Sequence, residues 1–513
     1  MMADGRNLLV PFILITSLFF LWGFCNGMID VMDKHFQQEL GLTLAQSAWV
    51  QFAHYLGYFL MAVPAGWLAN KFGYKGGIIF GLLMVALGGF WFIPATKIAT
   101  FPAFLLGVCI IASGLTFLET VANPYSTVLG PKEYAATRIN LSQSCNGIGW
   151  ILGPIVGAKF FYSQNAAGES TGAETLWIPY AIIGVAVLLL SVVFFFAKLP
   201  DIQSEDEFHL DDTADLEQPI AAGKSKIGSG LLLLNILMLS VAVGMIISAI
   251  VAIPSISAKL GMTDSHALLY SATVLFLVGA TVFAVKGQKM TGHSIWAQPH
   301  FTGATLAQFF YVAAQCGIFA YFINYMTSQI PAVPESWKSG MFVDWFEIHK
   351  NGILGLTDKS ASTLAAVGFG FFLAGRFIGA GLMKKFPPYK ILGVFAIAAA
   401  LCSLTVFMKL GWASAIALFL TYFFMSIMFP TIFSLGIHGL GSRAKNASSF
   451  IVMAIMGGAI MPKFMGHIGD LHGMSVAFIV PLVCFILITI YSFAWPKLTG
   501  GNTDIVIDPS RGH

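Results

Sequence analysis

The sequence is dominated by apolar stretches, each roughly 20 to 28 residues long. An α-helix rises ~1.5 Å per residue, so each of these stretches is long enough to cross a ~30 Å hydrocarbon core. Composition excludes soluble domains, because hydrophobic residues make up 57% of the chain and charged residues only 10%. We therefore predict an all-α polytopic membrane protein.

The apolar stretches form two sets of six, separated by an acidic linker and by two further stretches. The two further stretches predict an inserted helix pair and bring the total to about 14 transmembrane helices, with a re-entrant course for one of them as the alternative. A pair preserves the sidedness of the second set, whereas a single helix would invert it. The stretches lie near 8–32, 45–70, 76–95, 101–128, 137–162 and 177–198, then 229–253 and 267–285, then 300–327, 361–383, 389–408, 412–434, 446–469 and 474–496.

This order divides the chain into five parts. The linker is too acidic and polar to bury itself, so we expect it to be a surface loop. The parts are an N-terminal six-helix bundle (1–200), an acidic cytoplasmic linker (201–228), an inserted transmembrane helix pair (229–299), a C-terminal six-helix bundle (300–498) and a C-terminal tail (499–513).

Two short repeats relate the two bundles. Residues 65–72 resemble residues 380–386, each after the second stretch of its bundle, and 124–130 share a proline and a Leu-Gly pair with 430–436. Parallel repeats about an axis along the membrane normal are typical of the major facilitator fold. We predict that fold.

The basic residues indicate orientation rather than a nucleic-acid partner. The net charge is only +3, and Lys and Arg are spread over every second short loop. Short loops with an excess of Lys and Arg lie on the cytoplasmic side of a membrane. We therefore expect both termini to be cytoplasmic, in a cell inner membrane whose lipid bilayer surrounds the protein. All six cysteines lie in apolar stretches without metal-ligand spacing, so no metal site is expected.

Glu119 is a carboxylic acid in the middle of an apolar stretch. Thr116, Thr120 and Asn123 lie at helical spacing from it, so the four side chains share one face. Ionisable groups inside a membrane are costly and usually mark a substrate or proton pathway. The alternative is a neutral Glu that is hydrogen-bonded by neighbouring helices.

The first apolar stretch carries an aromatic, an amide and a carboxylate at every fourth position, namely Trp22, Asn26 and Asp30. Helical spacing places them on one face. Aromatic rings cover apolar sugar surfaces, while amides and carboxylates bind hydroxyl groups, so this face is suited to a sugar. Asp30 also has a second interpretation as a solvated helix end, because Asp33 is close by.

The first stretch of the second bundle has a comparable polar face. Gln308, Tyr311 and Gln315 lie on it, and they would form the opposite wall of a binding site. Hydrogen bonding between helices, common in membranes, is the other interpretation.

Several motifs occur together in the sequence, at 20–23, 58–66, 118–124, 140–143 and 430–436. Together they resemble the fucose–proton symporter family of the major facilitator superfamily. The resemblance extends over both bundles but not over the inserted pair or the loop at 328–360.

The resemblance implies roles for individual residues. It implies that Asp30 and Glu119 take part in proton coupling and sugar recognition. It also implies a polar fifth-helix pattern at Asn140, Gln143 and Asn146. His54 departs from the family, where an aromatic residue is common, so the sugar need not be fucose. His54 is either a helix–helix contact or a titratable partner of an acid.

We therefore predict a secondary active transporter, not an enzyme, because no phosphate-binding loop or nucleophile elbow is present. It would take up a monosaccharide, either a hexose, a deoxyhexose or an amino sugar, by proton symport through alternating access. It would act as a monomer and need no cofactor. Sodium-coupled transport, uncoupled transport and a membrane sugar sensor without transport remain the alternatives.

Overall fold

The structure is a computed structural model of the 513-residue chain. It describes residues 2–3, 6–7, 9–128, 135–162, 172–197, 199, 226–251, 261–286, 294–338, 344–348, 354–383, 385–438, 440 and 444–500.

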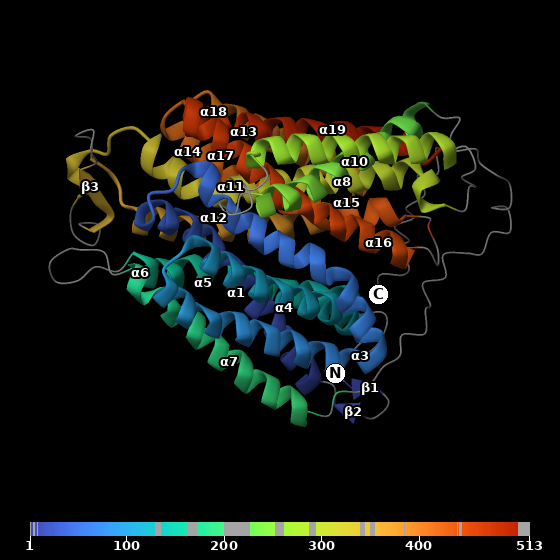
Figure 1. Ribbon diagram of the computed structural model, residues 1–513, viewed down its shortest axis with the longest axis horizontal. Helices are drawn as coiled ribbons and strands as arrows, with labels where there is room; N and C mark the ends of the chain where they lie inside the picture. The colour runs from blue at the N-terminus through green and yellow to red at the C-terminus, as the bar shows by residue number, and fades with distance from the viewer. Residues whose placement is uncertain are drawn as a thin grey trace.

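The helices form two bundles that lie side by side (Figure 1). The N-terminal bundle contains α1 (Leu9–Glu39), α2 (Leu44–Ser47), α3 (Trp49–Ile98), α4 (Phe101–Val128), α5 (Ala135–Phe161), α6 (Gly172–Thr175) and α7 (Trp177–Phe196). The C-terminal bundle contains α11 (Pro299–Ser328), α12 (Asp358–Met383), α13 (Pro388–Phe407), α14 (Trp412–Met425), α15 (Met428–Ile437), α16 (Ala444–Met453), α17 (Gly457–His472), α18 (Met474–Ala477) and α19 (Ile479–Leu498).

The described part of the chain is helical over every one of the predicted apolar stretches. By length and hydropathy, twelve helices among the described residues can cross a membrane. The stretches near 45–70 and 137–162 are not among the twelve, but they are helical too, within α3 and α5. The predicted fold class is confirmed.

Helix α3 covers two predicted stretches. It is interrupted at Gly73, whose φ of 71° and ψ of 177° are not helical. Glycine reaches such a left-handed conformation without the steric cost that a Cβ would add. The chain therefore turns between two spans without an intervening loop.

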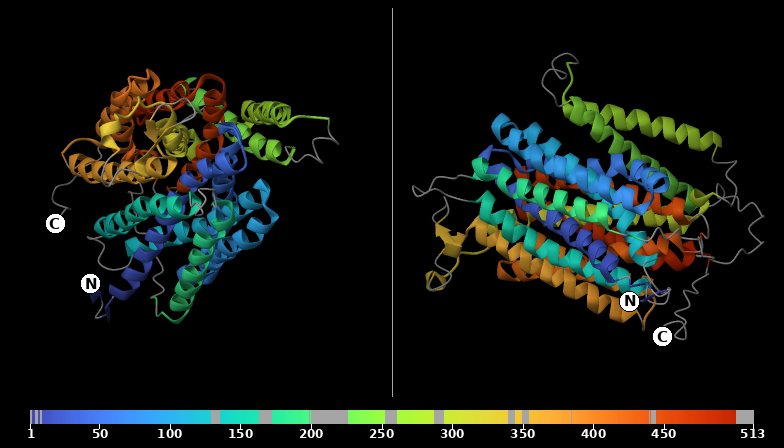
Figure 2. Two further views of the ribbon diagram at one scale, coloured as in Figure 1. Left: turned by 90° about the vertical axis from the view of Figure 1, so that its left-hand side faces the viewer. Right: turned by 90° about the horizontal axis from the view of Figure 1, so that it is seen from below.

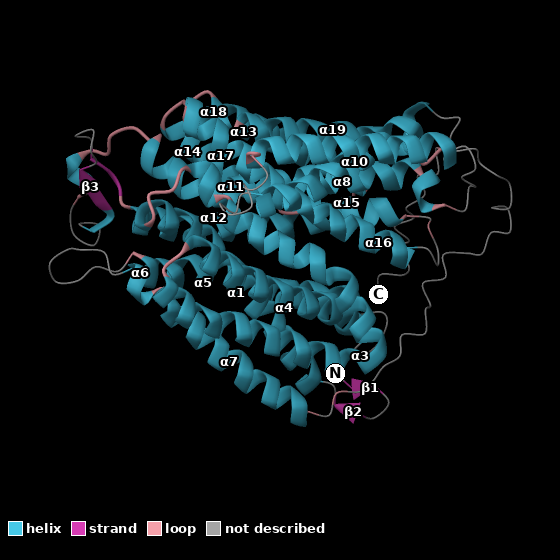
Figure 3. Cartoon of the chain, viewed as in Figure 1, coloured by secondary structure: helices cyan, strands magenta, loops and turns pink. Residues whose placement is uncertain are grey.

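Short elements lie outside the long helices (Figure 3). Strands β3 (Phe346–Ile348) and β4 (Leu354–Leu356) pair antiparallel in the loop before α12, where the sequence analysis predicted no strand. The others are the paired strands β1 (Met2–Ala3) and β2 (Arg6–Asn7) and the 3₁₀ helices η5 (Ile295–Ala297), η6 (Glu335–Trp337) and η9 (Ala454–Met456).

The inserted pair consists of α8 (Lys226–Val251) and α10 (Asp264–Lys286) and lies at the edge of the molecule (Figure 2). Asn235 of α8 donates a hydrogen bond to the carbonyl of Thr302 (2.9 Å) and accepts one from the hydroxyl of Thr305 (2.6 Å). Met245 of α8 is buried in an apolar cluster with Phe52 of α3, Phe309 of α11 and residues of α17. Helix α8 therefore covers a seam between the bundles, and α10 lies outside it.

A set of polar contacts joins the two bundles at one end of the molecule, which we call the closed end. It is formed by α2, by the C-terminal parts of α1, α11 and α17, and by the start of α12. Lys34 of α1 forms an ion pair with Asp358 of α12 (3.6 Å), and Gln38 also donates a hydrogen bond to Asp358. In Figure 1 the bundles approach each other at this end, on the left, and spread apart towards the side where α1 begins.

Asp470 of α17 makes a second connection at the closed end. Its carboxylate accepts hydrogen bonds from the backbone N–H groups of Leu44 (2.9 Å) and Ala45 (3.0 Å), which begin α2 in the other bundle. Two further contacts have the opposite direction, because the C-terminal bundle donates: Tyr321 donates to the carbonyl of Leu44 (2.9 Å), and Asn324 donates to the side chain of Gln37 (2.6 Å). The closed end is thus held by groups from both bundles.

Candidate functional site

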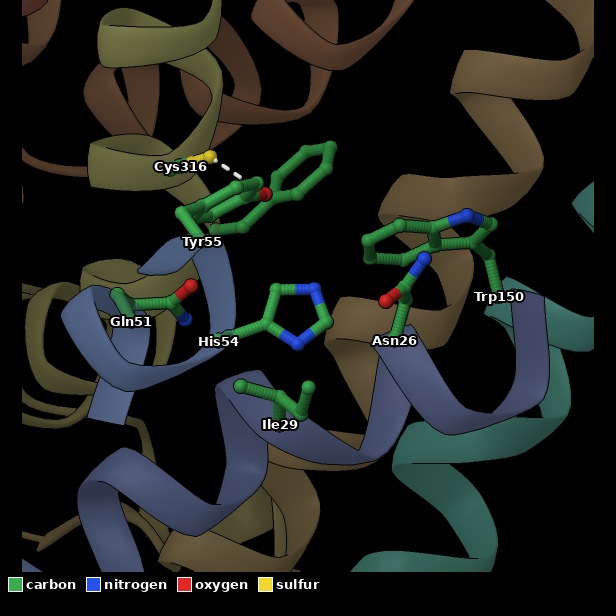
Figure 4. Close-up of a pocket in the computed structure, with 8 residues that line it drawn as sticks. Asn26, Ile29, Gln51, His54, Tyr55, Trp150 and Cys316 are labelled. Carbon is green, nitrogen blue, oxygen red and sulfur yellow. Dashed lines mark hydrogen bonds between the residues drawn. The ribbon is translucent and has the colours of Figure 1, made fainter. Parts of the chain in front are cut away.

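A cavity lies between the two bundles (Figure 4). Its free space holds about one water molecule, so a larger ligand requires the bundles to move apart. It is lined by Asn26 and Ile29 of α1, Gln51, His54 and Tyr55 of α3, Trp150 of α5, and Cys316 and Phe319 of α11.

Closely packed glycines position the wall formed by α1 and α5. Gly23 and Gly27 flank Asn26, and a Cβ on Gly23 would lie 2.0 Å from the carbonyl oxygen of Asn146. On α5, a Cβ on Gly149 would lie 2.4 Å from the carbonyl oxygen of Phe20. Small residues four apart let membrane helices approach this closely. The contact brings Asn26 next to Trp150, which follows Gly149.

Two buried polar atoms in this cavity wall have no hydrogen-bond partner among the described residues: Nδ1 of His54 and Oδ1 of Asn26. His54 is 3% exposed and Asn26 is 7% exposed. Figure 4 shows the imidazole in the middle of the lining side chains, between Gln51 and Asn26. An unsatisfied buried polar group costs about 1–3 kcal/mol, so this wall is poised to bind a polar group.

Aromatic rings from both bundles meet at the same cavity. The rings of Trp150 and Phe319 contact each other across the bundle interface, with centres 5.5 Å apart and planes tilted by 56°. The thiol of Cys316 donates to the hydroxyl of Tyr55 over 2.9 Å and also joins the bundles. The cavity therefore combines polar atoms with apolar faces.

A second small cavity lies beside the first and contains Glu119. Trp22 and Glu119 line it together with apolar residues of α1 and α4. The indole N–H of Trp22 donates to the hydroxyl of Tyr58 (2.6 Å), and Tyr58 lies within electrostatic reach of Glu119. The ring of Tyr58 is 5.1 Å from that of His54. Tyr58 thus connects the carboxyl group with the first cavity.

The remaining predicted residues of the N-terminal bundle have different surroundings. Asp30, Asn123 and Asn140 lie in α1, α4 and α5, but their side chains are outside the described part of the structure. Gln143 is half-buried in α5. Asn146 is buried and donates to the carbonyl of Phe19 (3.1 Å), so it ties α5 to α1 and lines neither cavity.

The predicted face of α11 is largely buried. Gln308 and Tyr311 are completely buried, and neither amide atom of Gln308 nor the hydroxyl of Tyr311 has a hydrogen-bond partner within the described residues. Arg376 of α12 lies within electrostatic reach of Tyr311 and stacks on the ring of Phe372. Gln315 is half-buried. Tyr311 and Arg376 are thus the pair that the structure brings together, and none of these residues lines either of the two cavities.

Among the residues that line the first cavity, the sequence analysis did not select the polar and aromatic side chains of Gln51, Tyr55 and Trp150. One signal was available, because Gln51, His54, Tyr55 and Tyr58 are spaced as on one helical face. Trp150 carries no such signal. Among the described residues there is no group of three or more His, Cys, Asp and Glu side chains that could hold a metal ion.

Comparisons with known proteins agree with this architecture. The Major Facilitator Superfamily matches residues 12–316. The L-fucose-proton symporter of Escherichia coli is 33% identical over 508 residues, covering 96% of this chain and 94% of the symporter. The chain belongs to the fucose–proton symporter family of the Major Facilitator Superfamily.

Other relatives of this family are also transporters. A glucose/galactose transporter of Brucella abortus is 28% identical, covering 94% of this chain and 93% of the relative. The crystal structure of the family member FucP in the outward conformation matches with 31% identity and a TM-score of 0.58, over 96% of this chain and 99% of that one. A POT family transporter in complex with a peptide conjugate shares only 10% identity but has a TM-score of 0.66, covering 97% and 98% of the two chains, which shows the common fold.

Proposed function

We propose that the protein is a secondary active transporter that takes up a monosaccharide together with protons by alternating access. The observation that carries this proposal is the cavity between the bundles, where His54 and Asn26 present unsatisfied polar atoms beside the rings of Trp150 and Phe319. The names of the relatives support the substrate class, since they are fucose–proton symporters and glucose/galactose transporters.

The site chemistry is suited to a sugar ring. Aromatic faces pack against the apolar C–H surface of a sugar, and an amide and an imidazole exchange hydrogen bonds with its hydroxyl groups. A hexose, a deoxyhexose or an amino sugar meets these requirements equally. No cofactor is needed for such binding, and a monomer is sufficient because both cavity walls come from one chain.

Glu119 is the proposed site of proton coupling. A carboxyl group inside the membrane can alternate between a protonated and an ionised form as its cavity opens to either side. Tyr58 stands between Glu119 and the first cavity, so sugar binding and the charge of Glu119 act on the same tyrosine. Asp30, one turn beyond Asn26 on α1, is the second proposed coupling residue.

The closed end is proposed to face the outside of the cell, with both termini in the cytoplasm and the protein in the inner membrane. The loop charges support this orientation. Sugar entry from outside would then require the contacts of Asp358 and Asp470 to open. The relative FucP has been observed in an outward conformation, and rocking of two bundles about a central site links such states.

The experiment is uptake of radiolabelled L-fucose, D-galactose and D-glucose into proteoliposomes with an imposed pH gradient. We expect accumulation of at least one sugar that collapses when the gradient is removed. Glu119→Gln should abolish accumulation but leave sugar exchange detectable, because Gln keeps hydrogen-bonding capacity and cannot carry a proton. Normal accumulation by the Gln variant would contradict the coupling role.

Other outcomes identify the alternatives. Accumulation that follows a sodium gradient and ignores the pH gradient would show sodium coupling, and equilibration without accumulation would show uncoupled transport. Sugar binding without any uptake would show a membrane sensor.

A further inference from the structure

We propose that His54 hydrogen-bonds directly to the transported sugar and determines which sugars the protein accepts. The inference rests on the proposed function and goes beyond it, because it assigns selectivity to one side chain of the second span.

The first argument is the surroundings of His54. Its ring packs edge-on against Tyr55, with ring centres 4.9 Å apart, and at a tilt of 56° against Tyr58, with ring centres 5.1 Å apart. These contacts fix the ring, yet Nδ1 has no hydrogen-bond partner among the described residues. A neutral imidazole has one donor and one acceptor nitrogen, and His54 lines the cavity, so its unused nitrogen becomes available to a ligand hydroxyl when the cavity widens.

The second argument is the second unsatisfied atom on the same wall, Oδ1 of Asn26. A carbonyl oxygen only accepts hydrogen bonds. A single water molecule is small enough for the cavity as it stands. Like water, a sugar hydroxyl can both donate and accept hydrogen bonds. It can therefore bind to Nδ1 of His54 and Oδ1 of Asn26 once the cavity has widened.

The third argument is which parts of the site move together. Asn26, His54 and Trp150 all belong to the N-terminal bundle, and the glycine contacts between α1 and α5 hold two of them in place. Cys316 and Phe319 belong to the other bundle. When the bundles rock as rigid bodies, the first three residues keep their mutual geometry and Phe319 moves away. The N-terminal wall therefore provides a preformed half-site that can discriminate between sugars in every state.

This arrangement explains why a histidine sets selectivity. A site built to hydrogen-bond a hydroxyl group rejects an analogue that lacks it, because the buried polar group of the protein then stays unpaired. A phenylalanine at this position, which has no polar group, would discriminate by shape only.

The test measures the affinity of the purified full-length protein for a sugar panel by isothermal titration calorimetry. The panel contains L-fucose, D-galactose, D-glucose and monodeoxy derivatives of whichever of these binds best. His54→Leu should weaken binding of that sugar about tenfold to a hundredfold, since it removes the polar group. The His54→Gln variant should still bind sugar, but the order of its affinities for the sugars of the panel should change.

His35→Leu is the matched control. His35 is also a buried histidine of the N-terminal bundle, but it packs against Phe36 and Phe161 and does not line the cavity. Its replacement should leave the affinities and their order unchanged.

The deoxy sugars keep the test decisive if His54→Leu does not fold. One monodeoxy sugar should bind to the wild type much more weakly than its parent sugar. In His54→Gln this difference in affinity should become smaller or should appear with a different deoxy sugar. Unchanged differences for every deoxy sugar in a folded His54→Gln variant would overturn the proposal while leaving the transport function intact. Failure of the wild type to bind any sugar would instead overturn the proposed function.

Discussion

Replacing Asp470 by Ala should loosen the closed end without unfolding α2. The carboxylate of Asp470 accepts hydrogen bonds from the first two N–H groups of α2, across the bundle interface. Helix α2 has its own capping box, in which Thr43 and Gln46 satisfy each other's backbone N–H groups. The helix therefore keeps its local cap, and the substitution weakens only the connection between the bundles.

The size of the effect follows from the contact. Removing a side chain that caps a helix start costs about 0.5–2 kcal/mol. Asp470 is exposed and water can replace it, so the lower half of this range is expected. Each 1.4 kcal/mol changes an equilibrium constant tenfold, so the fraction of molecules open at this end should rise about two- to tenfold.

Cys316 provides a natural reporter for this opening. Its side chain is 2% exposed and contacts Tyr55 across the interface, so a membrane-impermeant maleimide added outside can reach it only after the closed end opens. Peptide mapping by mass spectrometry on right-side-out vesicles gives the labelling rate of this residue. The rate should rise about two- to tenfold in Asp470→Ala.

Glu174→Ala is the control, because Glu174 is an exposed acid of α6 in the same region of the molecule. In this variant Cys316 should react with the maleimide at the wild-type rate. A folded Asp470→Ala variant with an unchanged Cys316 rate would refute the role of Asp470. A rate that rises only for reagent on the cytoplasmic side would show that the proposed orientation is wrong.

Two further predictions concern the fifth helix and the inserted pair. Gln143→Ala should weaken sugar binding roughly tenfold to a hundredfold in calorimetry, since a buried polar partner is lost; wild-type affinity would remove Gln143 from the site. A deletion that joins Lys226 to Gln298 should still accumulate sugar in proteoliposomes but melt at a lower temperature, because Phe52 and Phe309 lose their contacts with α8. A folded deletion variant that binds no sugar would show that the pair contributes to the site.

The sequence determined the elements and part of the site. Apolar length predicted a helix over every stretch, because helix formation in a membrane depends on local composition and on internal hydrogen bonds. Helical spacing placed Trp22 and Asn26 on one face, and the structure has both of them in cavity walls. Glu119 was found in the same way, since a carboxylate within an apolar stretch is visible without any knowledge of its neighbours.

Only the tertiary structure decided which of these faces meet. Asn146 and Gln308 have the residue types and spacing of binding residues, yet Asn146 ties α5 to α1, and Gln308 is completely buried and lines neither cavity. Trp150 became a site residue through the glycine contact of α5 with α1 and through Phe319 in the other bundle. Periodicity fixes the face of one helix, whereas the rotation of that helix against its neighbours depends on packing with residues hundreds of positions away. For the same reason the contact of Asp470 with α2, 425 residues apart in the chain, could be found only in the folded molecule.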